Sequence, residues 1–265
     1  MALLPMVRHR LLPENSSQGR IEPRIIVLHS AAGAGDSLYN WFSTGSNLES
    51  HFYVSRNGGA EQYIDTNIRA DANYHANGFA LSIETENDPA IVRSHRWDDD
   101  PWTDPQLAKL IEICNYLASI HPGIRRQKCT SWDGTGLGWH IMFGSPGPWT
   151  PSAKACPGAR RIQQVKDIIL PAFTAGIVAP TPSQHVDAPA GVPALRRGAT
   201  GARVSQLQRA LNYGIQSRLT VDGDFGGNTD GAVRNLQSFF GLDVDGVYGP
   251  KSQWWLQVSC NQRST

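Results

Sequence analysis

The residues best suited to chemistry in this 265-residue chain lie in one stretch rich in proline and glycine, WHIMFGSPGPWTPSAKACPG, from Trp139 to Gly158. The stretch contains His140, Lys154 and Cys156. Each of its four prolines fixes φ and removes a backbone donor, so we expect a stiff loop rather than a helix or strand. Imidazole and thiolate are ligands that zinc prefers. The loop therefore offers two candidate ligands, and a catalytic zinc site needs a third.

His29 is the third candidate ligand, because it follows the apolar run RIIVL at residues 24–28. Such a run predicts a buried strand, and open α/β sheets place ligands at the carboxyl ends of their strands. Taken alone, this histidine is better explained as a hydrogen-bonded core residue. Together with His140 and Cys156 it gives three protein ligands, the number found in catalytic zinc sites that keep a fourth position for water.

Two charged residues are candidates for the catalytic steps. The alternating run FALSIETE at residues 79–86 predicts a strand with Glu84 on its polar face. If that face looks toward the metal, Glu84 is the best-placed general base; the alternative is a solvated carboxylate. Lys154 precedes Cys156 by two residues, so in an extended segment both side chains share one side. Its ammonium could then stabilise an oxyanion, the alternative again being a solvated charge.

Composition narrows the classes of partner. A net charge of +1 gives no whole-chain reason to expect nucleic-acid binding. No stretch approaches the length of a membrane span, and the first 20 residues lack the apolar run of a signal peptide. The four cysteines have no regular spacing and do not form a disulfide framework. We expect a monomer that does not insert into membranes and is held in the cytosol until something releases it.

The first part of the chain, residues 1–173, reads as an α/β domain, because strand-like runs are mixed with amphipathic helical stripes. A hairpin is predicted at Arg56–Gly59, and helices are predicted over 104–120 and 158–170. Three further expectations concern surface segments: residues 1–23 form a loose lead-in, Asp36 caps a short helix, and the acidic run at 94–101 is a solvated turn.

A linker and a second module follow. Residues 174–191 are rich in proline and alanine, which predicts a semi-extended linker. Residues 192–265 contain an internal repeat, in which LTVDGDFG at 219–226 is echoed by LDVDGVYG at 242–249. A calcium loop is excluded because Val233 stands where a bidentate glutamate is needed. The repeat therefore indicates Asp-Gly turns in a small helical domain.

Several of these stretches resemble a known family. RIIVLHS, SHFYVSRNGG, NYHANGFALSIETEN and PSAKACPG are similar to zinc-dependent N-acetylmuramoyl-L-alanine amidases of the bacteriophage endolysin type, which are related to peptidoglycan recognition proteins. LRRGATGARVSQLQRALN, VDGDFGGNT and GLDVDGVYGPKS are similar to a three-helix peptidoglycan-binding domain. The resemblance implies a central mixed β-sheet flanked by helices, with a small three-helix domain after the linker.

The resemblance also implies roles for individual residues. It makes His29, His140 and Cys156 the zinc ligands, with Lys154 as the catalytic lysine of the Lys-x-Cys-Pro signature. Glu84 falls where many members have the acidic residue that activates water.

The resemblance further places His75 in the wall of the substrate groove. Ser50 stands where some members have a functional tyrosine, a departure that shifts weight to Glu84.

The function implied is that of a phage endolysin. It waits in the host cytoplasm, then acts at the peptidoglycan layer and hydrolyses the amide between N-acetylmuramic acid and L-alanine. One alternative is a peptidoglycan-binding protein without catalysis, although such relatives commonly lack the cysteine ligand that Cys156 supplies here. The other is a zinc endopeptidase that cuts within the stem peptide.

Overall fold

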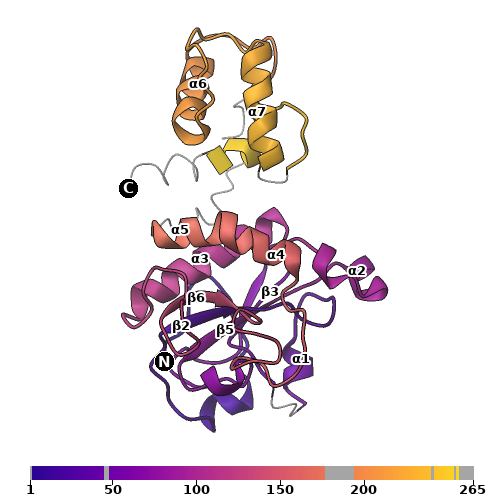
Figure 1. The fold of residues 1–265 in the computed structure, drawn as a ribbon, viewed down its shortest axis with the longest axis vertical. Coiled ribbons are helices and arrows are strands. Elements are labelled where there is room, and N and C mark those ends of the chain that lie inside the picture. The colour runs from indigo at the N-terminus through magenta and orange to yellow at the C-terminus, as the bar shows by residue number, and fades with distance from the viewer. Residues whose placement is uncertain (1, 45–47, 177–193, 240–241, 254, 257–265) are drawn as a thin grey trace. The chain divides into compact units, whose positions relative to one another are not determined.

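The computed structural model describes residues 2–44, 48–176, 194–239, 242–253 and 255–256, and it divides the chain into two compact units, residues 1–179 and 180–265 (Figure 1). The predicted linker at 174–191 lies outside the described residues, apart from its first three. Of those three, Thr174 is the last residue of the helix Leu170–Thr174, and residues 175–176 form a turn. No helix within the described ranges is long and apolar enough to cross a membrane.

A six-stranded sheet organises the first unit. Its strand order is β1-β4-β3-β5-β2-β6, and only the β3–β4 pair is antiparallel. The predicted mixed sheet is therefore confirmed. The strands are β1 (Arg8–His9), β2 (Ile25–Leu28), β3 (Phe52–Val54), β4 (Ala60–Gln62), β5 (Ala80–Thr85) and β6 (Gly136–Trp139).

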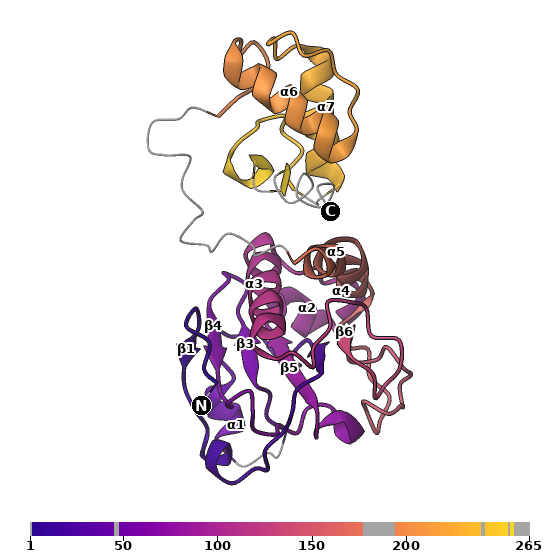
Figure 2. The ribbon, with the colours of Figure 1, turned by 90° about the vertical axis from the view of Figure 1, so that its left-hand side faces the viewer.

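Helices pack against this sheet, and α3 and α5 also contact each other (Figures 1 and 2). The helix predicted over 104–120 is α3, and a capping box between Thr103 and Gln106 begins it. The helices of this unit are α1 (Tyr39–Phe42), α2 (Pro89–Ser94), α3 (Asp104–Ile120), α4 (Ala159–Gln164) and α5 (Leu170–Thr174), with a π-helical turn at Val165–Ile169 between the last two.

The predicted hairpin is present between β3 and β4. Gly58 adopts φ 84°, a backbone conformation that favours glycine, and its amide donates to the Ser55 carbonyl at 2.9 Å. The Asn57 side chain accepts from the amide of Gly59 at 2.9 Å. The turn thus follows from local chemistry that the sequence already displays.

Two predictions about the surface of this unit are wrong. Residues 1–23 are not a loose lead-in, because β1 pairs with β4 and the side chains of Leu4 and Leu12 are buried. Asp36 does not cap α1: that helix begins after Leu38, and no side chain caps it. Both segments are fixed by packing on distant residues, which their local sequence does not display.

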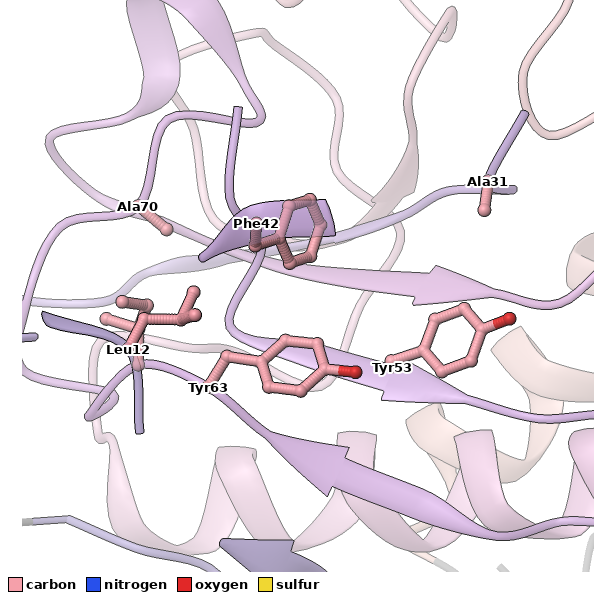
Figure 3. Packing of buried hydrophobic residues seen from close by; sticks show 7 residues of the cluster. Leu12, Ala31, Phe42, Tyr53, Tyr63 and Ala70 are labelled. Atoms are coloured by element: carbon pink, nitrogen blue, oxygen red, sulfur yellow. The ribbon is translucent and has the colours of Figure 1, made fainter. Parts of the chain in front are cut away.

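One core cluster supports the loop between β2 and α1. It contains Leu12, Ala31, Phe42, Tyr53, Tyr63, Ile64 and Ala70, and Figure 3 shows the Phe42 ring beside that of Tyr63. The hydroxyl of Tyr53 donates to the Gly35 carbonyl at 2.5 Å, and the Leu38 amide donates to the Tyr63 hydroxyl at 2.9 Å. The hydroxyl groups of these two buried tyrosines therefore tie residues 31–38 to the sheet.

The second unit contains α6 (Ala202–Ile215) and α7 (Gly227–Phe239), and residues 250–253 are also helical. The sequence repeat is a structural repeat. The Gln208 side chain bonds the Gly223 amide and the Asp222 carboxylate, and Gln237 bonds Gly246 and Asp245 in the same way. These carboxylates organise turns, which confirms the turn interpretation. Trp255 is buried, as expected for core packing.

Candidate active site

Two histidines meet because they follow neighbouring parallel strands. In the β2–β6 register Leu28 pairs with Trp139, so His29 and His140 leave the sheet side by side at its carboxyl edge. Their ring centroids are 4.3 Å apart, and both side chains are buried. A nitrogen of each ring and the Cys156 sulfur all lie within 4.8 Å of one another. The three ligands predicted from separate segments therefore converge.

The loop that carries Cys156 is held against the end of β2. The Ser30 amide donates to the Cys156 sulfur at 3.1 Å. Just beyond, Gly158 adopts φ 100°, and a Cβ on it would lie 2.2 Å from the Trp97 carbonyl oxygen. The Ala159 amide then donates to the Asp98 carboxylate at 2.9 Å. Only glycine fits this close approach, which fixes where the cysteine emerges.

Each histidine has one nitrogen engaged by the protein and one directed to the cluster. The Nε2 atom of His29 lies 2.8 Å from Asn73 Oδ1, and that of His140 lies 3.1 Å from the Trp149 carbonyl oxygen. Hydrogen bonds of this kind select the tautomer and orient the ring of a metal ligand. The Nδ1 atom of His140 is buried without a hydrogen-bond partner. An unpaired buried acceptor is costly unless something binds it.

The protonation states suit metal binding. Burial lowers the pKa of His140 to about 4, so its imidazole is neutral near neutral pH and can donate a lone pair. Burial likewise lowers the pKa of His29, with a smaller contribution from His140. Burial and the nearby Glu84 raise the pKa of the Cys156 thiol to about 12, so a metal must displace its proton. Two nitrogens, one of them buried without a hydrogen-bond partner, and one sulfur fit zinc.

Glu84 and Lys154 share a cavity with this cluster. The cavity has a volume of about 290 Å³ and is lined by Ser30, Ala31, Ala32, Glu84, Trp97, His140, Lys154, Ala155 and Cys156. Glu84 Oε1 lies 3.7 Å from His29 Nδ1, and the buried Oε2 has no hydrogen-bond partner. Burial raises the pKa of Glu84 to about 7, against the opposing effects of Lys154 and Arg161. A carboxylate so tuned can both accept and return a proton near neutral pH.

The remaining predicted residue, His75, does not line this cavity. It lies in the 3-10 turn Tyr74–Ala76, where its amide donates to the Pro148 carbonyl at 3.2 Å. Its ring is close to those of Tyr74 and Trp132, at centroid distances of 3.9 and 6.4 Å. The structure thus brings five of the six predicted residues together. His75 lies outside this group, beside the exposed rings of Tyr74 and Trp132.

The prediction of a solvated acidic run at 94–101 is wrong for Asp100. This carboxylate is buried and pairs with the guanidinium of Arg161 at 2.8 Å and with that of Arg56 at 3.4 Å. Arg161 is itself fully buried and also donates to the Glu86 carbonyl at 3.0 Å. The ion pair ties α4 to the acidic segment, and the hydrogen bond to Glu86 ties α4 to the end of β5, the strand that carries Glu84. The local run of charges does not indicate that Asp100 has a buried partner, because that partner, Arg161, lies 61 residues away in the sequence.

Comparison with known proteins adds two family matches. The family model described as N-acetylmuramoyl-L-alanine amidase matches residues 19–159, and a model for a peptidoglycan binding domain matches residues 200–252. The first range contains every residue of the cavity and of the ligand cluster.

The individual curated relatives match this chain over short stretches only. A spore cortex-lytic enzyme of Halalkalibacterium halodurans is 42% identical over 67 residues, which are 25% of this chain and 20% of the relative. A zinc D-Ala-D-Ala carboxypeptidase of Streptomyces albus G is 45% identical over 58 residues, 21% of this chain and 23% of the relative. The chain thus spans about a fifth of the length of these curated relatives.

Solved structures of low sequence identity are also similar to this chain. One is the N-acetylmuramoyl-L-alanine amidase LysC from Clostridium intestinale, with a TM-score of 0.44 and 16% identity over 61% of this chain and 94% of that one. Another is the PlyG catalytic domain, with a TM-score of 0.43 and 18% identity over 66% of this chain and 97% of that one.

Proposed function

Because this chain belongs to the N-acetylmuramoyl-L-alanine amidase family, we propose that it hydrolyses the amide bond between N-acetylmuramic acid and L-alanine in bacterial peptidoglycan. The observation that carries the proposal is the convergence of three candidate zinc ligands with Glu84 and Lys154 around one cavity. A binding protein has no need of a buried, unpaired carboxylate oxygen beside a group of candidate metal ligands.

We assign zinc to His29, His140 and Cys156. Its ligand atoms would be the two Nδ1 nitrogens, since both Nε2 atoms are engaged, and the cysteine sulfur. When bound, zinc would supply Lewis acidity that polarises the scissile carbonyl and makes water easier to deprotonate. The protein itself contributes the fixed positions of these ligands and a pocket that holds the substrate amide.

The proton transfers fall to Glu84. The carboxylate takes a proton from the attacking water as the water oxygen forms its bond to the carbonyl carbon. When the carbon–nitrogen bond breaks, the same group returns that proton to the departing L-alanine nitrogen. The products are a free muramoyl carboxylate and a stem peptide with a free amino end.

Lys154 supplies positive charge where the carbonyl oxygen becomes negative. Its side chain lines the cavity together with Glu84 and Cys156. Its backbone is fixed by Ser145, whose hydroxyl accepts from the Lys154 amide at 2.6 Å and donates to its carbonyl at 2.9 Å. These bonds fix the point from which the side chain extends, and its ammonium would stabilise the oxyanion in the cavity.

The second unit serves as a tether. Its match to a peptidoglycan binding domain supports binding to the same polymer that the first unit cuts. Two linked modules on one polymer raise the local concentration of the catalytic site at its substrate. An amidase coupled to such a module suits wall lysis, and we propose that the chain acts at the peptidoglycan layer as an endolysin.

The alternatives predict different products. A recognition protein would bind peptidoglycan and release nothing. A zinc endopeptidase would use the same ligands but cut within the stem peptide, which would leave L-alanine attached to the sugar.

The experiment that tests the proposal compares Glu84→Gln with the wild type on a soluble muramoyl peptide. We expect Glu84→Gln to bind one zinc and to lose at least roughly a hundredfold in turnover, the usual size of a general-base contribution. Glu22→Gln, an exposed carboxylate outside the cavity, is the matched control and should behave as the wild type. Unchanged turnover in Glu84→Gln would remove Glu84 from the mechanism.

A further inference from the structure

One wall of the cavity is formed by an aromatic residue with no assigned role, Trp97. It belongs to the 3-10 turn Trp97–Asp99, which follows α2 in the same acidic segment that the sequence indicates to be solvated. The side chain is half-buried and lines the cavity together with Glu84 and the residues of the cysteine loop. A large aromatic side chain left partly open beside a reactive centre is a feature of binding sites.

The backbone of Trp97 is fixed on both sides. Its carbonyl oxygen lies against Gly158, where no side chain could be accommodated. The next residue, Asp98, accepts a hydrogen bond from the amide of Ala159 at 2.9 Å. Farther along, Asp100 is held by the buried guanidinium of Arg161. The indole therefore extends from a fixed backbone, which limits the conformational entropy lost when a ligand packs against it.

The lining of the same cavity includes three small apolar residues. Ala31, Ala32 and Ala155 contribute methyl groups to the same cavity, whereas its charged groups are Glu84 and Lys154. The indole and these methyl groups give the cavity a flat apolar surface. Its natural complement is a ligand with a broad face of C–H bonds rather than a charged or narrow one.

The groups next to the scissile bond can be compared on this basis. On the amine side stands L-alanine, whose single methyl group covers little of an indole. On the acyl side stands N-acetylmuramic acid, whose pyranose ring presents a broad C–H face. We propose that Trp97 stacks on the pyranose ring of N-acetylmuramic acid and thereby makes the sugar, not only the amide, a determinant of specificity. This inference rests on the proposed amidase function.

The test uses two substrates that share the scissile amide. One is a muramoyl peptide; in the other, a methoxy group replaces the sugar on the same lactyl peptide. For Trp97→Ala we expect kcat/KM to fall roughly tenfold on the muramoyl peptide, as for an aromatic hot-spot contact, and to stay within about twofold on the methoxy analogue. Trp97→Phe should recover most of the loss. Trp41→Ala, an exposed tryptophan outside the cavity lining, is the matched control.

A binding measurement separates this inference from the proposed function. In full-length Glu84→Gln, the affinity for the muramoyl peptide should fall roughly tenfold when Trp97→Ala is added, while the affinity for the methoxy analogue stays the same. Equal losses on both ligands, or no loss on either, would overturn the stacking role. If the wild type cleaves neither substrate, the amidase proposal fails, and the binding ratio alone still decides the role of Trp97.

Discussion

A substitution at Asn73 tests the metal site specifically, because Asn73 contacts the candidate ligand His29 and is not itself a candidate ligand. Its Oδ1 atom lies 2.8 Å from His29 Nε2, and both residues are buried. When zinc occupies Nδ1, the proton resides on Nε2 and is donated to this oxygen. The backbone of Asn73 is held in turn by Asn77, whose side chain accepts from the Asn73 amide at 2.6 Å. The acceptor is thus fixed before zinc arrives.

The magnitude follows from what each substitution removes. Asn73→Ala leaves a buried imidazole N–H without an acceptor and frees the ring to rotate. Loss of such a partner weakens metal binding about 10- to 100-fold, which corresponds to about 1.4 to 2.7 kcal/mol. Asn73→Asp keeps an oxygen in the same place. The Asn73 Nδ2 group has no hydrogen-bond partner, so its removal costs no hydrogen bond, and a carboxylate acceptor should preserve or strengthen zinc binding.

The assay is a competition titration of the full chain with a chromophoric zinc chelator. Asn40→Ala, an exposed asparagine, serves as the control, and Cys156→Ser gives the affinity when a ligand is lost. Zinc bound by Asn73→Ala as tightly as by the wild type would refute the orienting role. So would an Asn73→Asp variant as weak as Asn73→Ala, because the oxygen would then not be what matters.

Three further predictions concern stability. Arg161→Met should cost about 3 to 5 kcal/mol in urea unfolding because it strands the buried Asp100 carboxylate, whereas Met at the exposed neighbour Arg160 should cost under about 0.5 kcal/mol. Burial lowers the pKa of His51 from 6.5 to about 4, although Asp65 and a backbone acceptor oppose this and His121 adds to it. The unfolded chain therefore binds the proton first, and stability should fall by up to about 1.4 kcal/mol per pH unit as the pH drops through that window. His51→Gln should flatten this slope in urea titrations; an unchanged slope would exclude His51 as its source. Gln208→Ala should lower the stability of the second unit by about 1 to 3 kcal/mol in thermal unfolding, because it leaves turn groups unpaired.

Where local chemistry decides the structure, the sequence predicted it well. The Asn-Gly hairpin, the helix that begins at Asp104 and the strand before His29 all follow from residues within a few positions. The convergence of His29 with His140 depends on β6, a strand that the sequence analysis did not predict, because side chains at the carboxyl ends of neighbouring parallel strands meet. The sequence does not state which strands are neighbours, and the resemblance to a family implied the ligand set but no strand order.

The residues that sequence reasoning missed act through distant partners. Asn73 bonds a histidine 44 positions away, and the partner of Asp100 is 61 positions away. Nothing in the local pattern of either segment marks such a contact. The run around Asp100 even favours solvent, since three consecutive aspartates repel one another in a buried setting without a cation. Arg161 supplies that cation, and tertiary packing overrides the local preference.

The most direct test of the central claim is a digestion of purified peptidoglycan by the full chain, with mass analysis of the released fragments. The digestion is run with zinc present, after chelation, and after zinc is restored. The account predicts free stem peptides that begin with L-alanine, lost on chelation and recovered with zinc. Stem peptides cut at another bond would contradict the assigned substrate, and the same release after complete removal of zinc would contradict the metal site.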